Sequence, residues 1–156
     1  MIEIRTSTYD EMLAQADELF SLFSEHWDEV ALNKQVMVLK PDLQRYEAMG
    51  ANGNLLVLGA WDGDELVGYS VNFVMQHLHY KDLRICSNDL LFVAQAHRKG
   101  RVGLRLIRAT EEHARAAGAE LMLWHGKPNT ALVELMPALD YGVQDIIFSK
   151  QLSKGV

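Results

Sequence analysis

The chain has 156 residues, of which 49% are hydrophobic and 23% are charged, and its formal net charge at pH 7 is −6. This balance is typical of a folded globular protein and excludes a disordered chain, while the length suits one domain over residues 1–156. The negative charge argues against general affinity for nucleic acid, because binding to phosphates requires clustered lysine and arginine.

Cysteine content and hydropathy narrow the class further. Cys86 is the only cysteine, which excludes an internal disulfide and a multi-cysteine zinc cluster. No apolar run is long enough to span a bilayer, and the N-terminal residues lack the basic-then-apolar pattern of a secretory signal. We therefore expect a cytoplasmic protein with no membrane partner.

The first third of the chain predicts one strand and three helices. Ile2 to Arg5 alternates apolar and polar residues like a strand, and Tyr9 to Phe23 carries apolar residues at helical spacing. The more polar stretch from Glu25 to Lys34 indicates a short second helix. Proline suits a first helical turn and Gly50 can end a helix, so a third helix is predicted from Pro41 to Met49.

The middle of the chain predicts antiparallel strands and then a long helix. Leu55 to Trp61 and Leu66 to His79 are apolar, β-branched and aromatic runs, and the four residues between them, Asp-Gly-Asp-Glu, are a hairpin signal. Leu83 to Val93 predicts the next strand. It leads almost directly into a helix from Arg101 to Ala117, which stops at Gly118.

The last third predicts a strand, a helix and a strand. Leu121 to Trp124 is a short strand of the buried type, Asn129 can cap a helix that reaches Met136, and Val143 to Leu152 predicts a terminal strand. The resulting order is β-α-α-α-β-β-β-α-β-α-β. It predicts an α/β (α+β) fold with a mixed, mostly antiparallel central sheet flanked by helices on both faces.

Positive charge is concentrated at the start of the long helix. Five basic residues and no acidic residue lie between Arg98 and Arg108. The helix dipole is positive at this end, where acidic side chains would ordinarily be stabilising. Gly100 and Gly103 let the backbone approach a ligand closely, and the N–H groups of the first helical turn are free donors. The pattern therefore predicts a bound phosphate or pyrophosphate.

The basic segment has other interpretations. The bases can instead pair with acids such as Glu111 and Glu112 at a solvated helix end. A P-loop is excluded because its G-x-x-x-x-G-K-[ST] pattern does not occur. A dinucleotide-binding fold is disfavoured because Glu120 precedes the second strand, whereas the acidic ribose ligand of that fold follows it.

The segment VAQAHRKGRVG, which begins at Val93, resembles the cofactor motif of GNAT N-acetyltransferases. That motif is Q/R-x-x-G-x-G/A after a strand that ends in valine, and Val93, Arg98 and Gly103 match it in register. Arg101 stands where the first motif glycine is usual. The hairpin, long helix, short strand, Asn129 and the strand after Gly142 also fall in the family's order. A weaker similarity, carried by residues 25–29, 77–80 and 89, links the chain to a phage-type subset.

This resemblance implies acetyl-CoA as co-substrate in a GNAT-like fold. The backbone of Leu91 and Val93 would pair with the pantetheine arm, and the amides of residues 98–104 would hold the pyrophosphate. Asn129 matches a family asparagine near the pantetheine. The cofactor-binding residues implied in this way are Leu91, Val93, Arg98, Lys99, Gly100, Arg101, Val102, Gly103, Leu104 and Asn129.

The resemblance also bears on the general acid. Family members often carry a tyrosine seven residues after this asparagine, which protonates the leaving thiolate. Met136 occupies that position here, and Tyr141 is the nearest substitute.

Asp89 is the candidate general base. An amine must be neutral to attack a thioester, so a positioned base should remove its proton. Asp89 lies four residues before Val93 in one strand, and strand parity predicts that both side chains face one side. The alternative is an acid that anchors a loop or a partner cation.

Residues 25–29 combine acids, an imidazole and an indole, and GNAT enzymes often build their acceptor site from this region. His26, Trp27 and Glu29 are therefore candidate substrate-binding residues, with a solvated helix connection as the alternative. His77 and His79 share a strand face at the end of an apolar stripe. We interpret them as core or rim histidines and predict no metal site, because no third ligand has a suitable spacing.

These observations lead to an acetyl-CoA-dependent N-acetyltransferase acting on a small-molecule or peptide amine. Direct attack in a ternary complex is expected, because Cys86 shows no sign of being a nucleophile. The acidic composition is compatible with a polyamine, an aminoglycoside or a lysine side chain. One alternative is a non-catalytic CoA-binding or interaction module, which Met136 favours, and another is RNA binding by the basic turn. The sequence is also compatible with a homodimer.

Overall fold

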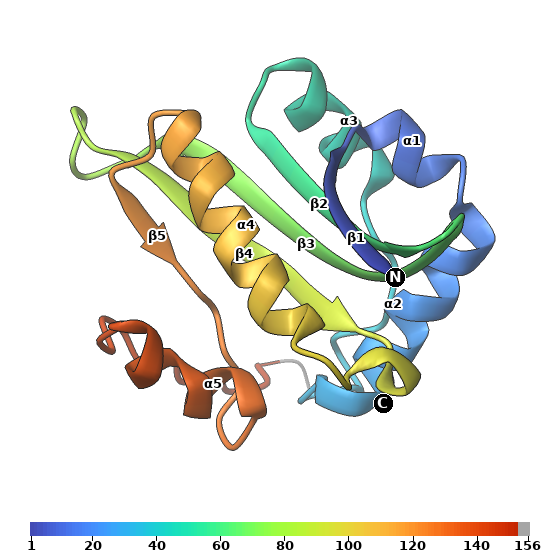
Figure 1. The fold of residues 1–156 in the computed structure, drawn as a ribbon. Helices are drawn as coiled ribbons and strands as arrows, with labels where there is room; N and C mark the ends of the chain where they lie inside the picture. Colours follow the sequence, from blue (N-terminus) through green and yellow to red (C-terminus); the bar gives the residue numbers. More distant parts are fainter. Residues whose placement is uncertain (153–156) are drawn as a thin grey trace.

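A five-stranded sheet forms the centre of the computed structural model, which describes residues 1–152 (Figure 1). The strand order follows the sequence, with four antiparallel strands and β5 parallel to β4. The prediction of a mixed, mostly antiparallel sheet is therefore confirmed. The strands are β1 (Ile2–Ser7), β2 (Leu55–Asp62), β3 (Glu65–Gln76), β4 (Arg84–Val93) and β5 (Leu121–Leu123).

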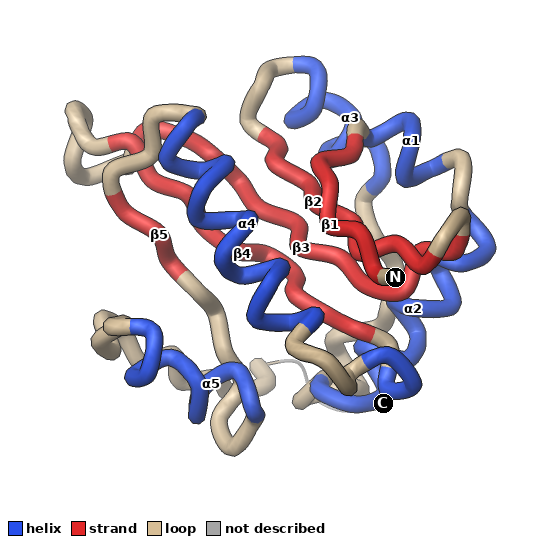
Figure 2. The backbone as a smooth tube through the Cα atoms, viewed as in Figure 1, coloured by secondary structure: helices blue, strands red, loops and turns tan. Residues whose placement is uncertain are grey.

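Helices cover both faces of the sheet, as the sequence predicted (Figure 2). Three of them pack on one face and α4 packs on the other, where it crosses in front of β3 and β4 in Figure 1. A short helix and a 3-10 turn follow β5. The helices are α1 (Tyr9–Leu13), α2 (Ala16–Val30), α3 (Leu43–Ala51), α4 (Val102–Ala116) and α5 (Ala131–Leu135), with 3-10 turns η1 (Gln95–His97) and η2 (Met136–Leu139).

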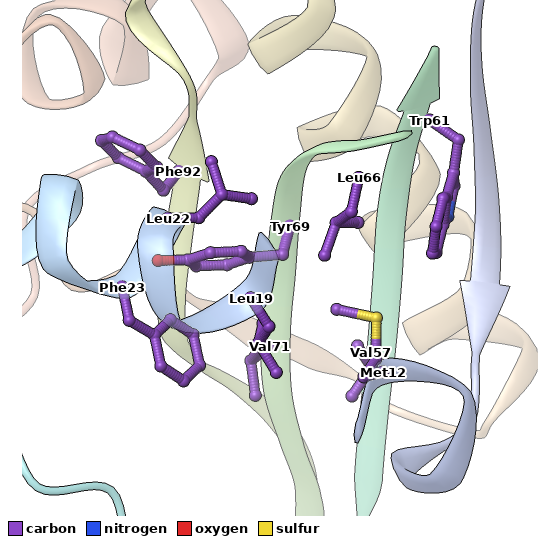
Figure 3. Close-up of a cluster of buried hydrophobic side chains, with 10 residues drawn as sticks. All are labelled: Met12, Leu19, Leu22, Phe23, Val57, Trp61, Leu66, Tyr69, Val71 and Phe92. Carbon is purple, nitrogen blue, oxygen red and sulfur yellow. The ribbon is translucent and has the colours of Figure 1, made fainter. Parts of the chain in front are cut away.

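The core has one layer on each face of the sheet. On the face of α1, α2 and α3, Tyr69 is fully buried and meets the ring of Phe23 edge to face at 5.2 Å, as Figure 3 shows. Phe92 packs in this layer too, whereas the next residue, Val93, packs with Val102 against α4. The alternation of β4 side chains between the two layers follows from the two-residue period of a strand.

A buried polar network interrupts this alternation in β4. Asn88 is 3% exposed, and its side-chain amide donates to Asn72 Oδ1 at 2.8 Å and to the Leu90 carbonyl at 3.1 Å. The pairing between β3 and β4 shifts here, because Val71 faces Leu90 while Asn72 faces Asn88. Asp89 is therefore the extra residue of a β-bulge.

The bulge makes the parity prediction for Asp89 wrong. The Asp89 carboxylate accepts a hydrogen bond from Tyr46, which packs on the face of α1, α2 and α3. Val93 packs on the opposite face with α4. An inserted residue reverses the parity between positions on its two sides, so the two side chains cannot share a face.

The N-terminal helices divide differently from the prediction. The predicted helix from Tyr9 to Phe23 is broken at Ala14 and Gln15, and α2 continues through the predicted second helix as far as Val30. Residues after Val30, including Leu32 to Lys40, are not in a regular helix. Despite this break, Met12 of α1 and the buried residues of α2 pack on the same face of the sheet.

Three predicted helix boundaries are also corrected. Pro41 lies before α3, whose N-cap is Asp42, and Gly50 lies inside that helix, which ends near Gly53 at φ 72°. The Asp42 carboxylate accepts from the Arg45 N–H, which is the cap that starts the helix. The prediction that Asn129 caps the next helix is wrong by one residue, because Thr130 is the N-cap of α5.

The terminal strand predicted from Val143 to Leu152 does not form. Its apolar side chains are exposed, including Phe148 at 88%. A β-type composition gives a strand only where another strand offers hydrogen-bond partners. The segment instead runs past the sheet, where Ser149 Oγ accepts from the Asn33 amide at 3.0 Å. Within residues 1–152, no helix is long and apolar enough to cross a membrane.

The Asn88 network gives the first testable prediction. Asn88→Leu keeps the side-chain size but removes the donor groups that hold the bulge, leaving Asn72 Oδ1 and the Leu90 carbonyl without this partner. We expect the free energy of unfolding to fall by about 1–3 kcal/mol in urea denaturation. Gln44→Leu on the exposed side of α3 is the control and should change it by less than about 0.5 kcal/mol. An unchanged stability of Asn88→Leu would contradict this role.

Candidate functional site

The site begins where β4 and β5 separate. They pair over three residues only, from Ile85 with Leu121 to Ser87 with Leu123, although β4 continues to Val93. The Ala94 N–H donates to the Val67 carbonyl of β3. The Val93 carbonyl points to the opposite side of β4, where it accepts from Arg98 Nε. Since backbone groups alternate along a strand, those of Leu91 also point to the side that β5 leaves open. This edge is the one required by the predicted pantetheine pairing.

A cavity of about 830 Å³ lies along this open edge. Its wall is built by the end of α2, residues 37–41, the second half of β4, the start of α4 and residues 125–135. The volume falls within the range of sites for small molecules and cofactors. Of the predicted site residues, those in the wall are His26, Trp27, Glu29, Asp89, Leu91, Val93, Arg98, Arg101, Gly103 and Leu104.

The remaining cofactor candidates lie outside the wall. Val102 is 2% exposed and packs in the core beneath α4, while Lys99 and Gly100 lie in the exposed turn before it. Asn129 is exposed with φ 62°, between the wall residues Lys127 and Thr130. Because its side chain is buried, Val102 could contact a ligand only through its backbone. The prediction for this residue was also a backbone contact, from its amide to the pyrophosphate.

Arg101, which stands where the motif usually has glycine, has a left-handed backbone conformation. It is the N-cap of α4 with φ 67°, and Gly100 before it has φ 96°. Left-handed backbone is unfavourable for a residue with a side chain, which explains why glycine is usual there. Arg101 pays this conformational cost and places an exposed guanidinium in the cavity wall beside the first turn of α4.

Arg98 is held by three contacts. Its guanidinium donates to both carboxylate oxygens of Glu29, at 2.9 and 2.5 Å, and through Nε to the Val93 carbonyl at 2.9 Å. It also lies over the Phe92 ring at 5.1 Å. The bidentate pair joins the end of α2 to the turn before α4, so the acidic partner of Arg98 comes from α2 and not from Glu111 or Glu112.

Asp89 projects into the cavity from the bulge. Its Oδ2 accepts from the Tyr46 hydroxyl at 2.5 Å, and Tyr46 also lines the cavity. Burial, and then this hydrogen bond, raise the pKa of Tyr46 above its ordinary value. The tyrosine therefore stays protonated and orients the carboxylate as a donor. This contact could not be predicted from local sequence patterns, because Tyr46 and Asp89 are 43 residues apart in the chain.

An aromatic group forms the floor beside Asp89. His26 stacks on Phe92 with ring centroids 4.7 Å apart, and its Nδ1 is 2.9 Å from the Tyr69 hydroxyl. Burial lowers the pKa of His26, so its ring is neutral at pH 7. The Trp27 indole N–H donates to the Met37 carbonyl at 2.7 Å and anchors the neighbouring wall segment.

Gly126 lies close to α5, behind the far wall. A Cβ there would lie 2.5 Å from a side-chain methyl carbon of Val133, so a larger residue would force this side chain to move. His125 Nε2 lies 3.0 Å from Ser87 Oγ, at the point where the strands separate. Sequence reasoning missed His125 and Lys127 as wall residues, since neither belongs to a motif.

Tyr141, the predicted general acid, and Cys86 both lie outside the cavity wall. The Tyr141 hydroxyl donates to Glu111 at 2.6 Å and is not part of the cavity wall. Burial, and then the bond to Glu111, raise the pKa of Tyr141 to about 12. The general-acid prediction for Tyr141 thus has no support from its position. Cys86 is fully buried beside α4, and burial raises the pKa of its thiol to about 11.

The two histidines of the β3–β4 turn stay apart from the site. His77 and His79 lie near each other with ring centroids 6.1 Å apart, at the opposite end of β4 from the cavity. Among residues 1–152, no group of three or more His, Cys, Asp or Glu side chains is arranged to hold a metal ion.

Comparison with known proteins assigns the chain to a family. The model of the acetyltransferase (GNAT) family matches residues 16–141. The chain belongs to the GNAT family. The match spans the whole cavity wall described above. No curated protein matches this GNAT protein by sequence.

Solved structures with the same fold include acetyltransferases with different acceptors. An aminoglycoside acetyltransferase from an uncultured soil metagenomic sample has a TM-score of 0.76 at 17% identity, with 98% of this chain and 99% of that chain covered. Glucosamine-6-phosphate N-acetyltransferase from Arabidopsis thaliana gives 0.72 at 10%, covering 98% and 99%. AAC(6')-Iy with the bisubstrate analogue CoA-S-monomethyl-acetylneamine gives 0.65 at 18%, covering 98% and 99%. At these identities the similarity shows the fold alone.

Arg101 provides a prediction that separates backbone strain from ligand binding. Arg101→Gly removes a side chain from left-handed backbone, so the free energy of unfolding should rise by about 1 kcal/mol. If the guanidinium contacts phosphate, affinity for CoA should fall about fivefold in calorimetry. S-acetylpantetheine, which lacks the pyrophosphate, is the control ligand and should bind both proteins equally. The same loss for both ligands would exclude a phosphate contact.

Proposed function

We propose that this GNAT protein is an acetyl-CoA-dependent N-acetyltransferase that acts by direct attack of an amine in a ternary complex. The observation that carries the proposal is one continuous cavity, with the free edge of β4 along its side. The positive N-terminus of α4 and the Asp89 carboxylate both line this cavity. The family match and the CoA analogue bound to AAC(6')-Iy support the choice of cofactor.

In this proposal CoA lies along β4 and ends at α4. The pantetheine arm would pair with backbone groups of Leu91 and Val93 on the edge that β5 leaves open. The pyrophosphate would meet the first N–H groups of α4, where Gly103 and Leu104 line the cavity and the helix dipole is positive. Among residues 1–152, Arg101 has no ion-pair partner, whereas Arg98 already pairs with Glu29.

Asp89 is the proposed base. It takes a proton from the acceptor ammonium, and the neutral nitrogen then attacks the thioester carbonyl carbon. The bond between that carbon and sulfur breaks, the thiolate leaves as CoA and takes up a proton, and the nitrogen loses its second proton. The products are an N-acetylated amine and free CoA thiol. Tyr46 is the proposed positioning residue, because its hydroxyl holds the Asp89 carboxylate in the cavity.

Direct attack is favoured over an acetylated cysteine. Cys86 has no exposed surface and is not in the cavity wall, and burial raises the pKa of its thiol to about 11. A thiol becomes an effective nucleophile only as an accessible thiolate. His26, Trp27 and the aromatic floor remain available to contact the acceptor.

A second candidate is a non-catalytic CoA-binding module with the same fold. It is favoured by Met136 at the position of the family tyrosine and by the engagement of Tyr141 with Glu111. Such a module would bind CoA but would release no CoA thiol from acetyl-CoA with any amine. The two proposals therefore predict the same affinity for CoA and differ in catalytic turnover.

Asp89→Asn tests the catalytic proposal. The substitution keeps the size and the hydrogen bond from Tyr46 but removes the base, so kcat for amine-dependent thiol release should fall about 100-fold. The dissociation constant of acetyl-CoA, measured by calorimetry, should stay within about twofold. Asp64→Asn in the β2–β3 turn is the matched control and should leave both values unchanged. Equal kcat for Asp89→Asn and the unmodified protein would remove Asp89 from the base role.

A further inference from the structure

The cavity wall has little negative charge to hold a cationic acceptor. Among residues 1–152, its acidic side chains are Glu29 and Asp89. Both oxygens of Glu29 accept from Arg98, so the Glu29 charge is already neutralised. Asp89 accepts from Tyr46, which is a neutral donor. One carboxylate therefore remains to pair with a positive charge of the acceptor.

Positive side chains in the same wall oppose a second cation. Lys40 and Lys127 line the cavity and are exposed. They would repel a second positive charge of the acceptor, and discrimination between ligands often comes from such repulsion. Although the whole chain is acidic, which suggested compatibility with a polyamine or an aminoglycoside, the wall itself disfavours an acceptor with several positive charges.

An apolar surface in the wall of the same cavity is available instead. Met37, Val38 and Leu39 line the cavity and are 54%, 72% and 38% exposed. Their backbone is fixed, because the Met37 carbonyl accepts from Trp27 at 2.7 Å and the Met37 N–H donates to Asn33 at 3.0 Å. Apolar side chains held in solvent at the mouth of a cavity are typical of a surface that binds an apolar group.

We infer that the acceptor is a small primary monoamine with an apolar body. Its single ammonium pairs with Asp89, and its body packs against Met37, Val38 and Leu39. The inference rests on the proposed acetyl transfer at this cavity and adds the chemical class of the acceptor. It also distinguishes this chain from relatives of the same fold whose names specify an aminoglycoside or a sugar phosphate.

The first test compares acceptors. Release of CoA thiol is measured from acetyl-CoA with 2-phenylethylamine as the apolar monoamine, and with spermidine and neamine as polycations. We expect kcat/KM for 2-phenylethylamine to exceed that for either polycation by at least about tenfold. A higher kcat/KM for spermidine or neamine would overturn the inference and leave the acetyl-transfer proposal intact.

The second test changes the apolar surface. Val38→Asp places a charge where the apolar body should pack, and we expect kcat/KM for 2-phenylethylamine to fall about tenfold while acetyl-CoA affinity is unchanged. Leu78→Asp is the matched control, because Leu78 is 93% exposed in the β3–β4 turn and outside the cavity wall. Equal kcat/KM for the two variants would count against the apolar contact.

A binding measurement separates the two proposals. Each amine is titrated by calorimetry into protein saturated with CoA, which cannot donate acetyl. Tighter binding of 2-phenylethylamine than of spermidine, with no thiol release from acetyl-CoA, would support the acceptor class while rejecting acetyl transfer. Binding of 2-phenylethylamine no tighter than spermidine would overturn the acceptor class whatever the turnover.

Discussion

The site depends on the short pairing between β4 and β5. Three residue pairs join the strands, and beyond Ser87 the edge of β4 has no strand beside it within residues 1–152. Unpaired backbone donors and acceptors in a cavity are costly unless water or a ligand satisfies them. A cofactor with amide groups of its own, such as the pantetheine arm of CoA, is the kind of ligand that such an edge suits. The cavity, and with it the proposed sites for the cofactor and the acceptor, follows from this separation.

The bulge next to the separation determines the side of the sheet to which Asp89, the proposed base, projects. The buried Asn88 amide bonds to Asn72 and to the Leu90 carbonyl, and the inserted residue, Asp89, turns toward Tyr46. Without the insertion, Asp89 would lie on the face that α4 covers. One inserted residue thus brings a carboxylate into the cavity that residues 37–39 also line, while the core on both faces stays packed.

The order of elements could be predicted because hydrophobic period and turn signals are local. The β2–β3 hairpin around Gly63 and the helix that ends before Gly118 are examples. Interactions between distant residues could not be predicted in this way. Arg98 pairs with Glu29, which lies 69 residues away in the sequence. This ion pair neutralises the charge of Glu29, one of the predicted substrate-binding residues. The failed terminal strand has the same origin, since Val143 to Leu152 has strand-like residues but no neighbouring strand.

Calorimetric titration of acetyl-CoA into the unmodified protein and into Gly103→Leu tests the placement of the cofactor most directly. A Cβ at Gly103 meets no atom within 4 Å, so the new side chain would enter the cavity at the start of α4 without disturbing the core. We expect binding by the unmodified protein and a loss of at least about tenfold in Gly103→Leu. Thermal stability should be equal or higher, because leucine favours a helix more than glycine does. Ala116→Leu at the far end of α4 should bind normally. Equal affinity of Gly103→Leu and the unmodified protein, or no binding by either, would contradict the proposed cofactor site.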